Sequence, residues 1–180
     1  TKVTSDILPG EKIDCVAYGC TSGTIAAGYD SIEKKIKKSK PEAIVTTPST
    51  SSIKALKKLK ANKIAVFTPY SKKLNDEVLE FFKKENFEIT ANSYFGIESD
   101  IDIGKVDPNH LYEILSKMDL NGAEALFVSC TALPALSLID KLEKKLNITV
   151  LSSNQTLIWD TLNSIKNKET TKGFGKIFEV

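Results

Sequence analysis

Two cysteines follow apolar runs at points where a strand would end. Cys20 comes after "CVAYG" and Cys130 after "ALFVS", and each is followed directly by a threonine, Thr21 or Thr131. The loops at the carboxyl ends of strands form the ligand site in an open α/β sheet. A thiol at a helix N-terminus also feels the positive end of the helix dipole, which lowers its pKa. The pattern predicts two functional thiols, whereas Cys15 lies within a strand pattern and is expected to be a small buried side chain.

Spacing disfavours the other common cysteine chemistries. Metal sites need clustered ligands such as C-x₂-C, and a phosphatase-type loop needs an arginine six residues after the cysteine, where Ala26 and Leu136 stand. His110 is the single histidine and is expected on the surface at the start of a helix, and no glycine-rich phosphate loop is present. Two opposed thiols can instead move a proton at carbon, or one can add to an activated double bond while the other delivers a proton. Neither metal nor nucleotide is expected.

Neutral donors dominate the ends of the predicted strands. All 25 basic residues are lysine, so no guanidinium fork can grip a carboxylate. Hydroxyls, amides and helix N-terminal N–H groups at these turns would suit an anion. For any single turn, ordinary helix capping is the alternative. These turns are 46–52, 68–71, 129–131 and 152–155 together with 19–23.

Composition is that of a soluble globular chain. The 180 residues are 41% apolar and 27% charged with a net charge of +2, enough for one domain or two small lobes. The lysines lie on helix-like faces without interleaved aromatics, so no nucleic-acid partner is expected. No apolar run is long enough to span a membrane, and no signal peptide is visible at the start. The three cysteines are odd in number and irregularly spaced, so no disulfide framework is expected. This favours a reducing compartment such as the cytoplasm.

Short β-branched runs alternate with longer amphipathic ones. This order predicts an α/β fold with parallel sheets and crossover helices. We expect a first lobe over 1–62, a second over 63–154, and a helix and tail over 155–180 that return to the first lobe. Strands are expected near 13–19, 43–47, 63–68, 87–93, 125–130 and 148–152, and helices near 22–38, 50–61, 72–86, 109–119, 134–146 and 155–167.

Several segments resemble the maleate cis-trans isomerase group of the aspartate/glutamate racemase superfamily. They are "VAYGCTSG", "VFTPYSKKLN", "FVSCTALP", "VLSSNQTLIWDTL" and the tail "GFGKIF", which together span nearly the whole chain in order. The resemblance extends to arylmalonate decarboxylases and ectoine-utilisation proteins. It implies two pseudo-symmetric lobes with the active site between them, no cofactor, and a homodimer.

The resemblance also implies roles for individual residues. Cys20 would attack an alkene carbon of a small dicarboxylate, and Cys130 would donate the proton. Bond rotation in the thioether intermediate and elimination would then give the trans isomer. Backbone N–H groups in the two turns would bind the carboxylates, and a tyrosine would hydrogen-bond the substrate. The expected substrate-binding residues are Thr21, Ser22, Tyr70, Asp100 and Thr131.

Two departures from the group are visible. Family members begin with a strand that ends in a Pro-Ser-Ser-Asn-like turn, and this chain starts after that point, so its first sheet is expected to have an unpaired edge. The isomerases also place an asparagine in the segment matching "GIESDIDIGKVDP". Here Asp100 is the best match, with Ser99 one residue away. An aspartate would repel a dicarboxylate and suit a substrate with an amino or hydroxyl donor.

Other functions remain open at this level. Arylmalonate decarboxylases keep the second cysteine but have glycine where Cys20 stands, so two thiols favour isomerisation or racemisation over decarboxylation. An amino-acid racemase of the aspartate/glutamate type would use the same pair. A carboxylate-binding protein without catalysis would need only the turns. A thiol redox protein would need Cys20 and Cys130 close enough to form a disulfide.

Overall fold

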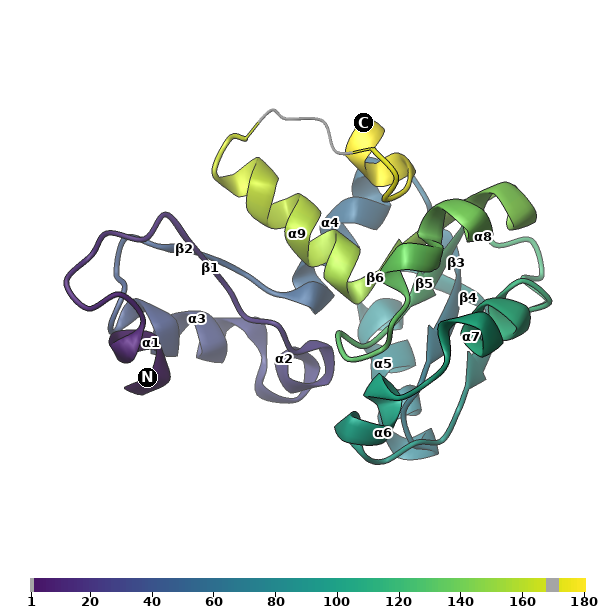
Figure 1. Ribbon diagram of the computed structural model, residues 1–180, viewed down its shortest axis with the longest axis horizontal. Helices are drawn as coiled ribbons and strands as arrows, with labels where there is room; N and C mark the ends of the chain where they lie inside the picture. Colours follow the sequence, from purple (N-terminus) through teal and green to yellow (C-terminus); the bar gives the residue numbers. More distant parts are fainter. Residues whose placement is uncertain (1, 168–171) are drawn as a thin grey trace.

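The computed structural model describes residues 2–167 and 172–180 of the chain, so residue 1 of the expected first lobe and residues 168–171 of the expected helix-and-tail segment lie outside the described residues. Two parallel sheets form the described part, one of two strands and one of four. Figure 1 shows the small sheet and the large sheet at opposite ends of the molecule, with α4 (Pro48–Lys58) and α9 (Ser153–Ser164) between them. The α/β class predicted from the sequence is confirmed.

The four-stranded sheet contains the larger core. Its strand order is β4–β3–β5–β6, all parallel, so β3 and β5 are its central strands. Both central strands are almost continuously buried, as expected for a parallel sheet covered on both faces. The strands are β3 (Lys63–Thr68), β4 (Glu88–Tyr94), β5 (Ala125–Val128) and β6 (Thr149–Ser152).

Amphipathic helices cover this sheet. Phe82 of α5 packs edge-to-face on Phe127 of β5 with ring centroids 5.1 Å apart, a geometry that aromatic pairs prefer. The helices that follow the large-sheet strands are α5 (Lys72–Lys84), α6 (Asp100–Gly104), α7 (Pro108–Leu115), α8 (Ile139–Leu146) and, after β6, α9. His110 lies exposed on α7, as predicted, and stacks on Phe95.

The two-stranded sheet has a smaller core of its own. Strand β1 (Cys15–Ala17) pairs with β2 (Ile44–Thr46), and within the described residues β1 has no second neighbour. Three buried side chains, Ile32, Ile36 and Val45, form its centre. Its helices are α1 (Lys2–Asp6), α2 (Thr21–Ala27) and α3 (Tyr29–Lys37). Within the described residues, the first sheet therefore has the unpaired edge expected from the sequence.

Helix α9 joins the two sheets. It contacts β1 and β2 of the small sheet, β6 of the large sheet, and α4 along its length. The tail, including the 3₁₀-helix η2 (Lys176–Glu179), packs on β6 and α9, with Ile177 fully buried. Helix α9 thus contacts the small sheet, while the tail packs near the large sheet, where Asp140 and Glu143 of α8 accept its N–H groups.

The expected strands all form, within a few residues of their predicted ends. The helix expected over 22–38 is two helices, because Gly28 adopts a φ of 76° that interrupts it. The helix expected from 134 starts as the 3₁₀-helix η1 (Leu136–Leu138) and continues as α8. The division into the lobes 1–62 and 63–154 stays a prediction, with the two sheets falling on either side of it.

Candidate active site

Cys20 lies at the end of the loop that leaves β1 and is the N-cap of α2. Its Sγ accepts a hydrogen bond from the backbone N–H of Gly23 at 3.2 Å and lies 3.8 Å from the Ser22 hydroxyl. The side chain is partly exposed. A Cβ on Gly23 would stand 2.8 Å from Cys20 Sγ, so the glycine leaves room for the sulfur. The thiol of Cys20 therefore accepts a backbone hydrogen bond and is partly exposed to solvent.

Cys130 follows β5 in a different kind of turn. Its φ is 87°, a left-handed conformation that side-chain-bearing residues rarely adopt, and it is only 6% exposed. Residues 131–135 are irregular, and the helix expected near 134–146 begins at Leu136 as η1, so Cys130 does not lie at a helix N-terminus. Burial raises the pKa of this thiol, although hydrogen bonds from Tyr70 and from the N–H groups of Ala132 and Leu133 oppose the rise. The second thiol is therefore a buried group that keeps its proton.

Direct hydrogen bonds join the two turns. The Thr131 hydroxyl, next to Cys130, donates to the carbonyl of Gly19 at 2.9 Å. The Thr21 hydroxyl, next to Cys20, donates to the Ser153 hydroxyl oxygen at 2.9 Å, and the Cys130 N–H donates to the same oxygen at 3.0 Å. Turns that are 110 residues apart in sequence thus face each other across the junction of the two sheets.

Tyr70 lies beside the turn of Cys130. It follows β3, is 3% exposed, and its phenol oxygen accepts a hydrogen bond from Ser129 at 3.5 Å. Burial raises the pKa of Tyr70, and the nearby charge of Cys130 raises it further. The phenol is therefore a neutral hydrogen-bond donor beside the second thiol.

Asp100 approaches the site from the surface. It begins α6 after the N-cap Ser99 and its side chain is exposed. Its negative charge is one of the influences that raise the pKa of Cys130. Ser99 accepts a hydrogen bond from the N–H of Asp102, and which of the two residues takes the place of the isomerases' asparagine stays a prediction.

Most of the other strand-end hydroxyls have structural partners. Thr47 caps α4, Ser49 donates to the carbonyl of Thr21 at 2.9 Å, and Ser51 donates to buried Asp160. The capping alternative therefore holds for the turn at 46–52. Ser152 and Gln155 form a capping box at the start of α9.

Two residues that the sequence did not single out contact the second turn. Ser153 bonds the N–H of Cys130, and the Asn154 amide donates to the carbonyl of Thr131 at 2.9 Å. The sequence analysis included them in the turn 152–155 and in the motif "VLSSNQTLIWDTL", but it gave neither as a site residue. Cys15 has no such role: its Sγ lies 3.8 Å from the Thr46 hydroxyl within the small sheet.

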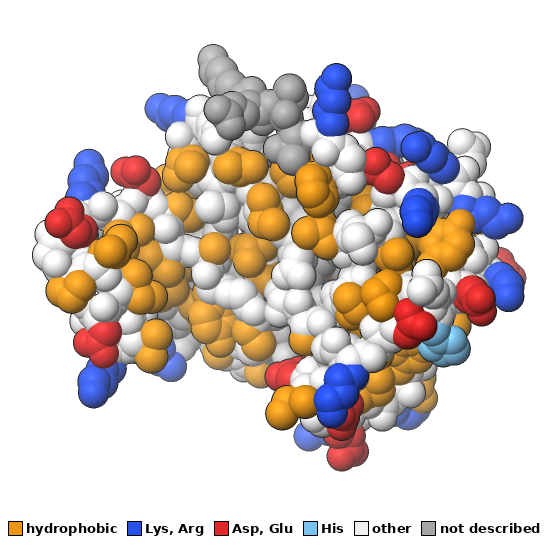
Figure 2. Space-filling model, viewed as in Figure 1, with side chains coloured by type: hydrophobic (Ala, Val, Ile, Leu, Met, Phe, Trp, Pro, Cys, Tyr) orange, Lys and Arg blue, Asp and Glu red, His pale blue; other side chains and the backbone are white. Residues whose placement is uncertain are grey.

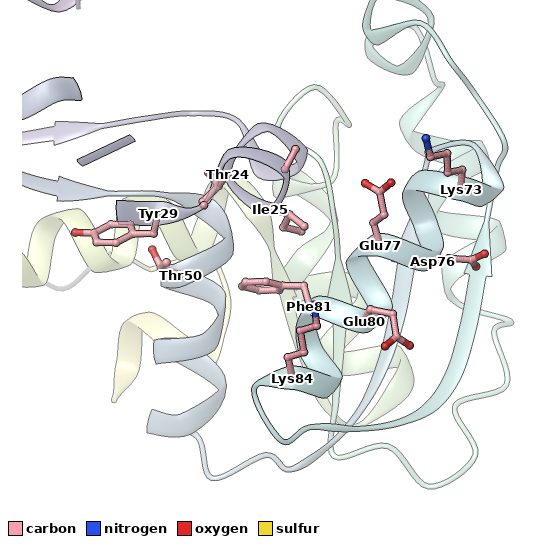
Figure 3. Close-up of a pocket in the computed structure, with 12 residues that line it drawn as sticks. Thr24, Ile25, Tyr29, Thr50, Lys73, Asp76, Glu77, Glu80, Phe81 and Lys84 are labelled. Atoms are coloured by element: carbon pink, nitrogen blue, oxygen red, sulfur yellow. The ribbon is translucent and has the colours of Figure 1, made fainter. Parts of the chain in front are cut away.

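Metal-ligand clusters are absent from the described ranges 2–167 and 172–180, and the three cysteines are free thiols. None of the described helices is long and apolar enough to cross a bilayer. A cavity of about 690 Å³ opens between α2 and α5 (Figure 3), where Ile25 and Phe81 face each other below Glu77. Neither Cys20 nor Cys130 lines it, so the linked cysteine turns are the better candidate for thiol chemistry.

Comparison with known proteins points to one group. Residues 23–178 match the family model described as arylmalonate decarboxylase. The maleate isomerase of Geobacillus stearothermophilus is 28% identical over 178 residues, covering 94% of this chain and 71% of the relative. The maleate isomerase of Pseudomonas putida is 25% identical with the same coverage.

Solved structures share the fold. The maleate isomerase of Pseudomonas putida S16 superposes with a TM-score of 0.87 at 19% identity, covering 98% of this chain and 73% of the other. The Nocardia farcinica maleate cis-trans isomerase, solved as a mutant with a covalently bound succinylcysteine intermediate, gives a TM-score of 0.87 at 20% identity, covering 97% and 73%. Unliganded arylmalonate decarboxylase gives 0.81 at 19% identity, covering 99% and 77%. The resemblance inferred from the sequence motifs is confirmed.

Proposed function

We propose, from the premise that this chain belongs to the arylmalonate decarboxylase family, that it is an isomerase of a small unsaturated dicarboxylate that uses two cysteines and no cofactor. Maleate is the proposed substrate, since the relatives of highest identity named above are maleate isomerases. The single observation that carries the proposal is the pair of cysteine turns held together by hydrogen bonds across the two sheets. One thiol alone would serve a decarboxylase.

The proposed mechanism uses the two thiols in turn. The Cys20 thiolate adds to one alkene carbon, and the pair of π electrons takes up the Cys130 proton at the other carbon. The product is a succinyl thioether on Cys20 and a thiolate on Cys130. The former double bond is now a C–C single bond, and rotation about it follows. The Cys130 thiolate then removes a proton from the carbon that was protonated, the double bond re-forms, and the C–S bond breaks to give fumarate and the Cys20 thiolate. The covalent intermediate captured in the Nocardia farcinica enzyme supports this route.

The environments of the thiols support these different roles. Cys20 is accessible and its sulfur accepts a backbone N–H, which suits a nucleophile. Burial raises the pKa of Cys130, which keeps a proton available for donation. Tyr70, as a neutral phenol, would hydrogen-bond the substrate.

Neutral groups would bind the two carboxylates. The proposed donors are the backbone N–H groups of Ser22 and Thr131, because no arginine exists in the chain. Thr21 itself is buried and bonded to Ser153, so we assign it to holding the turn together as well as shaping the site.

An amino-acid racemase is the second candidate. Asp100 favours it, because a carboxylate that acts electrostatically on Cys130 would attract a substrate ammonium and repel a second carboxylate. Racemisation would use the same thiols to remove an α-proton from one face and return it to the other.

We also propose that the chain acts in the cytoplasm as a homodimer. Three free cysteines suit a reducing compartment. Figure 2 shows apolar side chains gathered over the middle of one face, with charged side chains mainly around its outline. Ile44 and Ile158, on β2 and α9, are each 44% exposed, which supports burial against a second copy. Light scattering coupled to gel filtration measures the mass in solution, and a monomer at micromolar concentration would contradict the dimer.

Proton NMR in D₂O tests the function. The purified chain is incubated with maleate, and in parallel with L-aspartate and L-glutamate. Fumarate signals from maleate are the expected result, while loss of the α-proton signal of an amino acid would move the protein to the racemase class. A protein that changes none of the three would contradict both proposals.

A further inference from the structure

Ser153 is a buried side chain that touches both cysteine turns. It is the first residue of α9 and is 0% exposed. We propose that Ser153 is a positioning residue that fixes the turn of Cys130 against the turn of Cys20, so that proton donor and nucleophile act on one substrate. The inference rests on the proposed isomerase function.

One oxygen atom forms the bridge. Ser153 Oγ accepts the Thr21 hydroxyl at 2.9 Å and the Cys130 N–H at 3.0 Å. Thr21 directly follows Cys20, the proposed nucleophile, and Cys130 is the proposed proton donor. The two bonds therefore connect the residue after one reacting cysteine with the other reacting cysteine. Because all three groups are buried, water cannot replace the bridge.

The backbone at Cys130 needs this support. A φ of 87° is strained for a residue with a Cβ, and such a conformation persists only where its surroundings impose it. The bond from Ser153 holds the N–H of this residue, and Asn154 holds the carbonyl of the next one at 2.9 Å. Without the Ser153 oxygen, a buried N–H would lack a partner and the turn would relax.

The helix turn that contains Ser153 is fixed by hydrogen bonds of its neighbours Ser152 and Gln155. Gln155 closes the capping box on the N–H of Ser152, and its amide nitrogen donates to the carbonyl of Phe174 in the tail. The adjacent Gly175 has a φ of 90°, and a Cβ there would lie 2.6 Å from the Gln155 amide nitrogen. The tail therefore fixes the first turn of α9, and this turn fixes the second cysteine.

A positioning role differs from a purely structural one in what it changes. Loss of the bridge misplaces the donor, so it should lower kcat more than it raises KM. It should also expose Cys130, which is buried, while leaving Cys20 as accessible as before. A general loss of stability would predict neither effect at temperatures well below unfolding.

The test compares Ser153→Ala with Ser153→Thr and with Ser52→Ala. Ser52 is a matched control because it is also 0% exposed, and its hydroxyl donates only to the carbonyl of Ser49 in its own helix, at 2.7 Å. For each folded variant, steady-state kinetics with maleate give kcat and KM. Peptide mass spectrometry after timed iodoacetamide treatment gives separate labelling rates for Cys20 and Cys130.

Ser153→Ala is expected to lower kcat about tenfold to a hundredfold, the scale of a small misplacement of reacting groups. Labelling of Cys130 should accelerate about tenfold or more as its N–H loses a bond and the turn opens. Ser153→Thr, which keeps the oxygen, should recover most of both properties, and Ser52→Ala should match the parent protein. Parent-like kcat and parent-like Cys130 labelling in Ser153→Ala would overturn the inference.

The labelling arm separates this inference from the proposed function. If the parent protein fails to isomerise maleate, the function is wrong, and the Cys130 labelling rates still decide whether Ser153 holds the turn. If Ser153→Ala does not fold, Thr21→Val removes the other partner of the same oxygen. Faster labelling of Cys130 in Thr21→Val supports the bridge, and a parent-like rate contradicts it.

Discussion

The two cysteine turns look alike in sequence and differ in structure. Cys20 caps a helix, is partly exposed, and accepts one backbone N–H at 3.2 Å. Cys130 ends a buried strand in a left-handed conformation, is 6% exposed, and precedes five irregular residues, 131–135. The same Cys-Thr pair thus occurs once in an open turn and once in a buried, strained one.

This difference suggests how one pair of identical groups can perform two tasks. A nucleophile must reach the substrate as a thiolate, whereas a proton donor must keep its proton until the reaction needs it. Burial provides the second condition by raising the pKa of Cys130. In the proposed mechanism, environment rather than residue type divides the roles of Cys20 and Cys130.

Removal of either thiol should cause the largest loss of activity. Cys20→Ala and Cys130→Ala should each lower kcat/KM for maleate at least about a thousandfold, roughly 4 kcal/mol of transition-state stabilisation. Steady-state assays with matched circular dichroism spectra measure this. Cys15→Ala is the control, since that thiol lies in the small sheet away from the turns. Full activity in either active-site variant would remove that thiol from the mechanism.

A methyl group beside the open thiol should have the next largest effect. The Cβ of Gly23→Ala would stand 2.8 Å from Cys20 Sγ and 2.9 Å from the Tyr18 hydroxyl, so the sulfur must move. We expect kcat to fall about tenfold or more, as for other small misplacements of a reacting group. In the control Gly104→Ala, the nearest atom is 3.9 Å away. Equal kcat values for the two variants would show that the sulfur is not restricted by this contact.

Tyr70→Phe should change the pH dependence of the buried thiol. The reaction needs protonated Cys130, so kcat is retained below its pKa and lost as pH rises through it. Burial puts this loss above the ordinary thiol pKa of about 8.5. The Tyr70 hydroxyl opposes that rise, so Tyr70→Phe should move the basic limb of the kcat profile to higher pH and lower its plateau. Tyr94→Phe, at an exposed site, is the control, and an unmoved limb in Tyr70→Phe would contradict the contact.

Asp100→Asn should produce the smallest change, in the opposite direction. The Asp100 charge raises the pKa of Cys130, so its removal should move the basic limb of the kcat profile to lower pH. The shift should be a fraction of a pH unit and should shrink in high salt, because Asp100 is exposed. Asp102→Asn serves as control, since Asp102 pairs with Lys105 on the same helix. A limb that moves to higher pH would show that Asp100 acts otherwise.

The fold was largely predictable because its signals are local. Continuous apolar runs such as "KIAVFT" and "ALFV" predict buried parallel strands, and both form the centre of the large sheet. The helix break at Gly28 and the delayed helix after Cys130 were missed, since both depend on backbone angles that the sequence pattern does not fix. An apolar periodicity continues through such positions even when the helix does not.

The sequence named Cys20, Cys130 and Tyr70, which the structure brings together, but it did not predict the hydrogen bonds that connect the turns. Strand ends and thiol type identified Cys20 and Cys130, while the resemblance added Tyr70. Ser153 was missed because a serine at a helix start is usually a cap, and only the tertiary structure brings its oxygen to Cys130. The motif "GFG" carried a signal whose physical reason, the close packing of its second glycine, Gly175, on Gln155, is visible only in the folded chain.

Capture of the covalent intermediate tests the central claim most directly. Cys130→Ser keeps the shape of the second turn but replaces the thiol with a far weaker acid, so the Cys20 adduct should persist for longer. After incubation with maleate and rapid acid quenching, peptide mass spectrometry should find a succinyl group on the peptide that contains Cys20 and none on Cys15. The account predicts this adduct, with slow or absent fumarate formation. Fumarate formation at the parent rate without any adduct on Cys20 would contradict it.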